Sequence, residues 1–281
     1  MRGLLVVNKA KGWTSFDIVN YCKHTLKTRE VGHLGTLDPM ATGVLVVTVG
    51  SATKLFDMFL NKTKKYVAKF EFGYSTDTLD AEGCLENKTD NIPSLQQISQ
   101  VLPLFLGQIE QIPPKYSAKK INGQKAYDLA RKGKDFELKP SKIMINNLKI
   151  LDYSNNVLTI EIECGAGTYI RSLGRDIALK LNSLATMIEL TRIEVGNFTL
   201  ENSINIKDEN VDIEKYILPI DSVFYNLPTL DSVEDVARLI NGQTLIRTVK
   251  DGDYKMYLNG EFVGIATSKD QHLKMSKFFK I

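Results

Sequence analysis

The sequence is poor in the residues that build covalent crosslinks or metal centres. Its 281 residues include three cysteines and three histidines, and Cys22, Cys84 and Cys164 lie far apart with no Cys-x-x-Cys pair. A disulfide framework needs an even, regularly spaced set of cysteines, and a zinc site needs clustered Cys and His ligands. We therefore expect neither disulfides nor a bound metal, and we interpret each cysteine as a small buried side chain.

Long hydrophobic runs are also missing. The longest largely apolar run, residues 44–49, is far shorter than the roughly 20 residues that a membrane-spanning helix needs. The apolar stretch near the N-terminus is too short for a signal peptide and is typical of a first strand. With 43% hydrophobic and 25% charged residues, the composition is that of an ordinary globular protein, which we expect in the cytoplasm.

Charge is distributed unevenly, although the net charge of +3 by itself predicts no partner. Residues 115–142 contain nine basic and three acidic residues, together with Tyr116 and Tyr127. Lysines and arginines neutralise phosphates while aromatic rings stack on bases, so this segment fits an RNA surface. Taken alone, the segment fits a solvated, lysine-rich loop better than an RNA surface. Residues 205–235 are acidic and include Pro219 and Pro228, which favours a connection between two domains.

Hydrophobic periodicity predicts a mixture of strands and helices. Thr14 and Asp17 form a capping box, and the following helix should present an apolar face made of Phe16, Val19, Cys22 and Leu26. Residues 66–72 alternate between apolar and polar types, which predicts a half-buried strand with Tyr66 at its exposed end. We also predict strands at residues 3–8, 43–49, 143–151 and 157–164, and helices at residues 53–60, 94–106 and 168–181.

These elements follow no strict strand-helix-strand repeat, which favours an α+β fold with a mixed, largely antiparallel sheet. After Pro228 the pattern changes to one short helix, near residues 232–240, and four brief strands. Turns at Asp251-Gly252 and Asn259-Gly260 predict hairpins there, and a small β-barrel is expected. We therefore predict a large domain at residues 1–225, with a basic insertion at 113–142, and a small domain at 226–281.

Asp38 stands in a glycine-flanked loop directly before Pro39, which holds the preceding residue extended. From local sequence alone, an Asp-Pro turn or a helix cap explains such a residue best. Arg171 by itself is a surface charge, and Tyr66 and Tyr169 are boundary residues. Likewise His33 is a polar turn residue and Leu190 a core residue. None of them alone indicates an activity.

Several motifs occur together and in order. Residues 32–45, GHLGTLDPMATGVL, resemble the catalytic motif of the TruB family of tRNA pseudouridine synthases. The resemblance continues at residues 65–66, 72–83, 113–123 and 167–173 and covers most of the first 200 residues. The chain is identified as a member of that family. It departs from the usual pattern at Ala10, where the family carries proline, and this affects a local turn.

The resemblance implies an isomerase that converts the uridine at tRNA position 55, in the T-arm, to pseudouridine without a cofactor. The reaction breaks the glycosidic bond, turns the uracil and forms a new bond through a ring carbon. Asp38 corresponds to the family's essential aspartate, which either attacks covalently or stabilises positive charge on the sugar. Arg171 would pair with Asp38 and keep it ionised.

The remaining residues would hold the substrate. Tyr66 and Tyr169 correspond to tyrosines that contact the target base, Tyr66 by stacking, and Leu190 corresponds to an apolar residue of the pocket. His33 would support the flipped-out nucleotide, whose extrusion costs a few kcal/mol. The basic insertion would grip the T-arm, and residues 241–281 are similar to a PUA-type RNA-binding domain. A monomer without an obligate protein partner is expected.

Three other functions are consistent with parts of the sequence. A glycoside hydrolase could pair Asp38 with Asp80, because two carboxylates carry that reaction. A tRNA-folding protein would use the basic surface without needing Asp38. The catalytic subunit of a guide-RNA-directed rRNA pseudouridine synthase shares the aspartate motif, but the basic insertion and the context of residues 117–119 argue against it.

Overall fold

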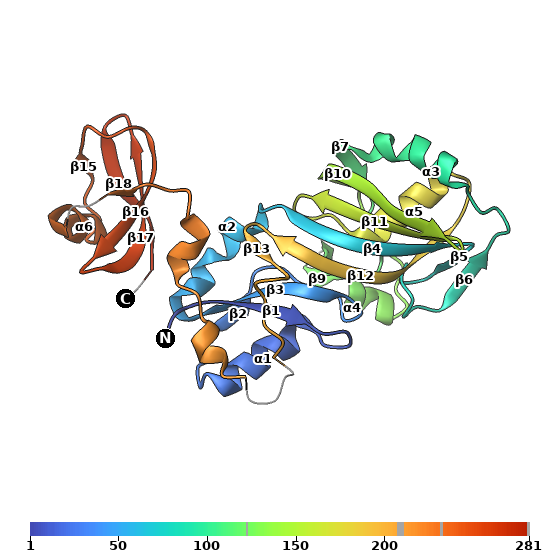
Figure 1. The fold of residues 1–281 in the computed structure, drawn as a ribbon, viewed down its shortest axis with the longest axis horizontal. Coiled ribbons are helices and arrows are strands. Elements are labelled where there is room, and N and C mark those ends of the chain that lie inside the picture. The colour runs from blue at the N-terminus through green and yellow to red at the C-terminus, as the bar shows by residue number, and fades with distance from the viewer. Residues whose placement is uncertain (122, 207–210, 231–232, 280–281) are drawn as a thin grey trace.

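A computed structural model describes residues 1–121, 123–206, 211–230 and 233–279 of the chain. A nine-stranded sheet forms its main body (Figure 1), and its strands are Gly3–Lys9 (β1), Val31–His33 (β2), Thr42–Val49 (β3), Lys64–Phe72 (β4), Gly107–Gln111 (β7), Ser141–Ser154 (β10), Val157–Cys164 (β11), Ala185–Val195 (β12) and Phe198–Thr199 (β13). The order is β1-β3-β12-β4-β11-β10-β7, with β2 on β3 and β13 on β12. Among the described strand pairs of this sheet only β12 with β3 is parallel. The predicted α+β fold with a mixed, largely antiparallel sheet is confirmed.

The helices of this body are Ser15–Thr25 (α1), Phe56–Leu60 (α2), Leu95–Val101 (α3), Ala126–Arg131 (α4) and Ile170–Lys180 (α5). Short 3₁₀ turns cover Gly50–Leu55 (η1), Leu102–Phe105 (η2), Ile213–Tyr216 (η3) and Ile220–Phe224 (η4). Two small hairpins pair Tyr74–Thr76 (β5) with Leu85–Lys88 (β6), and Lys120–Ile121 (β8) with Gln124–Lys125 (β9). In the described residues no helix is long and apolar enough to cross a membrane.

Strand β4 has the alternation that its sequence predicts. Tyr66, Ala68, Phe70 and Phe72 are buried, and the residues between them are partly exposed. Tyr66 is the third residue of the strand and only 8% exposed, so its predicted place at an exposed end was wrong. Helix α5 covers this buried face so closely that a Cβ at Gly174 would lie 2.3 Å from the Phe70 ring. A glycine there sets how near α5 can approach the sheet.

Helix α1 begins as predicted, with a reciprocal capping box between Thr14 and Asp17. Its expected apolar face was wrong at Phe16, which is 63% exposed. The buried stripe consists of Ser15, Ile18, Val19 and Cys22, the spacing of one helical face. Phe16 follows Ser15 by about 100° around the helix and therefore points away from the sheet.

Strand β12 was not predicted, yet it lies in the middle of the sheet. It pairs antiparallel with β4 over most of its length and parallel with β3 at Thr191 and Arg192. The buried Arg192, together with glutamates on the partly exposed face, interrupts the apolar alternation that marks a half-buried strand. The strand joins the two halves of the sheet, which carry different parts of the site.

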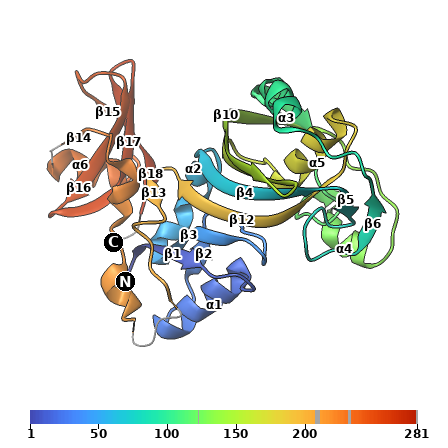
Figure 2. The ribbon, with the colours of Figure 1, turned by 45° about the vertical axis from the view of Figure 1, so that its right-hand side comes forward.

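Strands β1 and β3 are buried on both faces. Leu5 and Val47 face the core under α1 and α5, whereas Leu4 and Val46 face a second core that includes Phe59 of α2. The acidic segment crosses this second core: Leu218 pairs with Leu4, and Val223 and Phe224 are buried there. Phe262 and Phe279 of the C-terminal part pack into the same core. Figure 2 shows the C-terminal part on the side of the main body where β13 lies.

The C-terminal part contains helix Val233–Ile240 (α6) and a five-stranded sheet of Thr229–Leu230 (β14), Leu245–Ile246 (β15), Gly252–Leu258 (β16), Glu261–Lys269 (β17) and His272–Phe278 (β18). The order is β14-β16-β17-β18-β15. In the described residues no pair joins β14 to β15, so the sheet is open where a closed barrel was expected. A small β-rich part is confirmed, and its PUA-like character stays a prediction.

One of the two predicted hairpin turns is present. Asn259 and Gly260 join β16 to β17 with φ angles of 52° and 80°. The turn predicted at Asp251-Gly252 was wrong as a hairpin, because β15, which precedes it, pairs with β18 and not with β16. The second hairpin instead turns at Asp270 and Gln271, whose φ angles of 50° and 63° are also left-handed.

Candidate active site

The loop that carries Asp38 joins β2 to β3 and is held in place by the buried Arg192. The guanidinium donates from Nε to the Val44 carbonyl at 2.7 Å, from Nη2 to Gly35 at 3.0 Å and from Nη1 to Thr36 at 3.3 Å. Arg192 is 1% exposed. Gly43 permits this close approach, because a Cβ there would lie 2.2 Å from the Arg192 carbonyl oxygen.

The other side of the loop is anchored to β1 and α1. The Ser15 hydroxyl bonds to both backbone groups of Leu37, at 2.9 Å to its N–H and 3.1 Å to its carbonyl. The Lys9 ammonium donates to the carbonyls of Ala10, Trp13 and Pro39 at 3.2, 2.6 and 3.1 Å. Burial lowers the pKa of Lys9 to about 8, an effect that the nearby Asp38 charge opposes. Asp38 therefore stands on a rigid loop.

Arg171, near the start of α5, makes the predicted ion pair with Asp38. Its Nε lies 3.0 Å from Asp38 Oδ2, and the Asp38 side chain is 37% exposed while that of Arg171 is 8% exposed. The same guanidinium donates to the carbonyls of Thr78 at 2.9 Å and Tyr116 at 3.0 Å. The pair thus has one buried partner, fixed from several sides, and one partly accessible carboxylate.

Asp80 is a second carboxylate on the same guanidinium, with Oδ2 3.3 Å from Arg171 Nη1. Its side chain is 7% exposed, and its Oδ1 accepts from the Thr78 hydroxyl and from the backbone N–H of Glu82. Leu79, between them, has a left-handed φ of 63°, an uncommon conformation for a bulky residue. Sequence reasoning missed this role, although Asp80 lies in one of the shared motifs. Two carboxylates that bind one arginine also argue against a hydrolase pair flanking a sugar.

The two tyrosines lie in the electrostatic range of this ion pair. Burial raises the pKa of both Tyr66 and Tyr169, and the Asp38 charge adds a smaller upward contribution to each. Both phenols are therefore protonated at neutral pH. Leu190 is 6% exposed and belongs to the same core cluster as Tyr66. The structure thus places Asp38 in contact with Arg171, both tyrosines within the range of the Asp38 charge, and Leu190 in the core cluster that contains Tyr66.

His33 is the last residue of β2, directly before the loop that carries Asp38. Among the described residues its buried Nδ1 has no hydrogen-bond partner. Burial lowers the pKa of His33, and the Arg192 charge lowers it further. The imidazole is therefore held neutral, which suits a residue that fills space or donates a hydrogen bond better than one that carries charge.

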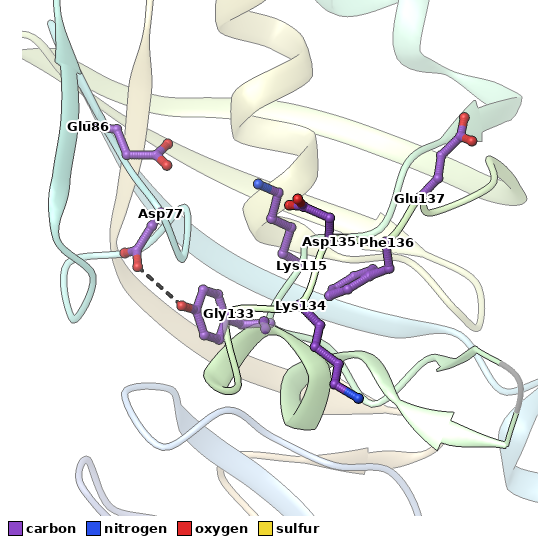
Figure 3. A pocket seen from close by; sticks show the side chains of 10 residues that line it. Asp77, Glu86, Lys115, Gly133, Lys134, Asp135, Phe136 and Glu137 are labelled. Atoms are coloured by element: carbon purple, nitrogen blue, oxygen red, sulfur yellow. Dashed lines mark hydrogen bonds between the residues drawn. The ribbon is translucent and has the colours of Figure 1, made fainter.

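A pocket of about 540 Å³ lies beside the site, between the β5-β6 hairpin and the insertion (Figure 3). Tyr116 lines it, and its hydroxyl lies 3.4 Å from Asp77 Oδ2 while its carbonyl accepts from Arg171. The charged lining residues are Asp77, Glu86, Lys115, Lys134, Asp135 and Glu137. This excess of carboxylates repels phosphate, so the pocket is unsuited to an RNA backbone.

The described part of the basic insertion is folded. Its two ends meet where Gln111 of β7 pairs with Ser141 of β10. Lys125 and Arg131 lie over the Tyr127 ring, at 5.3 and 5.7 Å from its centre. The cationic and aromatic side chains that the sequence singled out thus lie on a helix and a hairpin. Within the described residues, no group of three or more His, Cys, Asp or Glu could hold a metal ion.

Comparison with known proteins decides the family. A model described as TruB family pseudouridylate synthase (N terminal domain) matches residues 23–170, which include Asp38, Tyr66 and Asp80. The chain belongs to the TruB family. Two TruB-family relatives are both named tRNA pseudouridine synthase B. The protein from Clostridium kluyveri is 42% identical over 99% of this chain and 100% of its own length, and that from Aquifex aeolicus is 36% identical over 96% of both.

Solved structures show the same fold at lower identity. The structure described as a Cbf5-Nop10-Gar1 complex superposes with a TM-score of 0.73 at 24% identity, over 99% of this chain and 85% of that chain. A structure described as an H/ACA RNP bound to a substrate RNA gives a TM-score of 0.73 at 23% identity. The chain thus shares its fold with these proteins.

Proposed function

We propose that this chain is a tRNA pseudouridine synthase, an isomerase that converts the uridine at position 55 of the T-arm to pseudouridine. The observation that carries the proposal is the Asp38 and Arg171 ion pair, in which a partly accessible carboxylate is held at 3.0 Å by a buried, fully engaged guanidinium. The naming of nearly full-length relatives as tRNA pseudouridine synthase B supports the substrate class.

The reaction conserves every atom of the nucleotide. The bond between the sugar C1′ and the uracil N1 breaks, the uracil turns, a bond from C1′ to C5 forms, and the C5 proton is lost as N1 gains one. Asp38 either attacks covalently or stabilises positive charge at the reacting centre, and both routes need a carboxylate that stays ionised in a fixed position. Arg171 and the anchored loop supply that position. No cofactor takes part in this scheme.

The surrounding residues receive roles in substrate binding. Tyr66 stacks on the extruded base, Tyr169 contacts it, and Leu190 lines its pocket. His33, held neutral, fills the space that the flipped nucleotide leaves, which offsets part of the cost of extrusion. Tyr66 and Leu190 are buried and Tyr169 and His33 are partly buried, which supports apolar and stacking contacts with the base.

RNA binding is assigned to the insertion and the C-terminal part. The insertion at 113–142 grips the T-arm through its lysines and Arg131, and residues 226–281 form a PUA-like RNA-binding domain beside the catalytic domain at 1–225. The protein acts in the cytoplasm as a monomer without an obligate protein partner. Light scattering of the purified protein, alone and with tRNA, tests the oligomeric state.

The deciding experiment incubates the purified protein with an unmodified tRNA transcript and maps pseudouridine chemically. Wild type should modify one T-loop uridine without a guide RNA, and Asp38→Asn should modify none while binding the transcript normally. Asp57→Asn, which alters an exposed aspartate on α2, is the matched control and should retain full activity. Full activity of Asp38→Asn would overturn the assignment. A requirement for a guide RNA would favour the rRNA-directed enzyme.

A further inference from the structure

Helix α5, which carries Arg171, begins without a cap of its own. Its N-cap residue is Tyr169, whose side chain makes no capping hydrogen bond. The first backbone N–H groups of a helix have no partner inside the helix, and a buried helix start needs one from elsewhere. In a helix that carries a site residue in its first turn, the group that supplies this partner also fixes the site.

Gln111 supplies it. Its Oε1 accepts the backbone N–H of Tyr169 at 2.9 Å, and its Nε2 donates to the Tyr169 carbonyl at 3.1 Å. Gln111 is 2% exposed. One side-chain amide thus pairs with one residue's backbone in both directions, as a neighbouring strand would. This two-point contact fixes the orientation of the Tyr169 peptide groups as well as their distance.

The contact lies at the root of the RNA-gripping insertion. Gln111 is the last residue of β7 and pairs with Ser141, so the insertion leaves and re-enters the sheet at this point. The next residues also hold α5, because the Ile112 carbonyl accepts from Arg175 at 2.8 Å and the Tyr116 carbonyl accepts from Arg171 at 3.0 Å. The start of α5 is therefore tied to the insertion at successive points.

We propose that Gln111 is a positioning residue for pseudouridine formation, which holds the Tyr169 backbone so that Tyr169 meets the base and Arg171 meets Asp38. The inference rests on the proposed function of Asp38 and Arg171. Gln111 touches neither the base nor the reacting atoms. Its effect is geometric: Arg171 follows Tyr169 by two residues, and a shift of the helix start moves the guanidinium relative to Asp38.

Two variants of Gln111 test this. Gln111→Met keeps the volume and removes both hydrogen bonds, and Gln111→Glu keeps the acceptor and removes the donor. The single-turnover rate of pseudouridine formation at saturating enzyme should fall by about tenfold or more in Gln111→Met, since small misplacements of catalytic groups are costly. In Gln111→Glu the single-turnover rate should fall less than in Gln111→Met. The Kd for tRNA should stay within about threefold in both, because no RNA contact is lost.

Gln108→Met is the matched control, since Gln108 is an exposed glutamine on the same strand. It should leave both quantities unchanged. A rate in Gln111→Met within twofold of wild type would overturn the inference, as would a Kd that weakens in proportion to the rate, which would place Gln111 in RNA gripping. If neither Gln111 variant folds, the residue is structural only and the inference also fails.

A second measurement separates this inference from the proposed function. In an Arg171→Lys background, Gln111→Met should cost much less additional rate than it does alone, because residues that act through one another are not additive. If Gln111→Met lowers the rate by the same factor in both backgrounds, Gln111 does not act through Arg171 and the inference is overturned. The proposed role of Asp38 would not be affected by that result. Full activity of Asp38→Asn would instead overturn the proposed function, whatever the Gln111 variants do.

Discussion

The carboxylate of Asp80 lies 3.3 Å from the guanidinium of Arg171, and both side chains are more than nine-tenths buried. A guanidinium has five N–H donors, and Asp80 accepts at Nη1 while Asp38 accepts at Nε, so the two carboxylates bind different nitrogens of Arg171. The Thr78 hydroxyl and the Glu82 N–H hold Asp80 in turn. Arg171 is therefore oriented before any RNA binds.

Asp80→Asn should slow catalysis without releasing the RNA. The amide keeps the shape of the carboxylate but leaves Arg171 with one anionic partner, so the guanidinium can shift toward Asp38 or away from it. We expect the single-turnover rate to fall by about tenfold or more, with the Kd for tRNA little changed. Glu82→Gln, two residues on and exposed, is the control. Equal rates in Asp80→Asn and Glu82→Gln would contradict a role for Asp80.

Arg192→Lys should weaken both the fold and the activity. Lysine cannot reproduce the fork that donates to Gly35, Thr36 and Val44, so carbonyls of the Asp38 loop and of β3 lose their donors. We expect a loss of about 2–4 kcal/mol in the free energy of unfolding, measured by urea titration, and a lower rate at temperatures where the variant is folded. Arg238→Lys changes an exposed arginine and should cost little. An Arg192→Lys protein as stable as wild type would show that the Asp38 loop does not depend on the hydrogen bonds of Arg192.

Lys9 should make stability depend on pH in the alkaline range. Burial lowers its pKa to about 8, below the unfolded value near 10.5, so between these pH values the native state binds fewer protons than the unfolded state. Stability from this group therefore rises as pH increases from about 8 to about 10.5, by an amount on the order of 3 kcal/mol.

The comparison with Lys9→Met isolates that contribution from those of other alkaline groups. Unfolding free energies of wild type and variant are measured by urea titration at several pH values across the window. The difference between them should move in favour of wild type as pH rises. A difference that is flat, or that moves the other way, would show that Lys9 is not held in the native state with a lowered pKa.

The affinity for tRNA should fall steeply with salt, and the insertion should account for part of that slope. Replacing three exposed lysines, Lys119, Lys120 and Lys132, by glutamine should reduce the slope of log K against log salt by about two to three, if each contacts a phosphate. Replacing Lys88, Lys180 and Lys215, exposed lysines outside the insertion, is the control. An unchanged slope in the insertion variant would show that these lysines do not contact the RNA. Activity that does not depend on salt would contradict an RNA enzyme.

Local patterns in the sequence predicted what local physics controls. The capping box of α1 and the alternation of β4 were confirmed, because caps and pleats depend on neighbours in sequence. Phe16 was placed on the wrong side of α1, because the apolar residues of this helix allow more than one choice of buried face. Only packing against β2 and the core selects the face that consists of Ser15, Ile18, Val19 and Cys22. Strand β12 was missed because its central position allows a buried arginine that breaks the apolar pattern.

The sequence by itself determined the family, the class of fold and the identity of the candidate residues, through ordered motifs that carry Asp38, Tyr66 and Arg171. Only the tertiary structure decided how they are held. Arg171 reaches Asp38 and Asp80 because α5 packs on β4 at Gly174, and Gln111 reaches Tyr169 because β7 ends beside the start of α5. These partners are distant in the chain, so local sequence preferences do not set the distances between them. Those distances are set by the packing of the helix on the sheet.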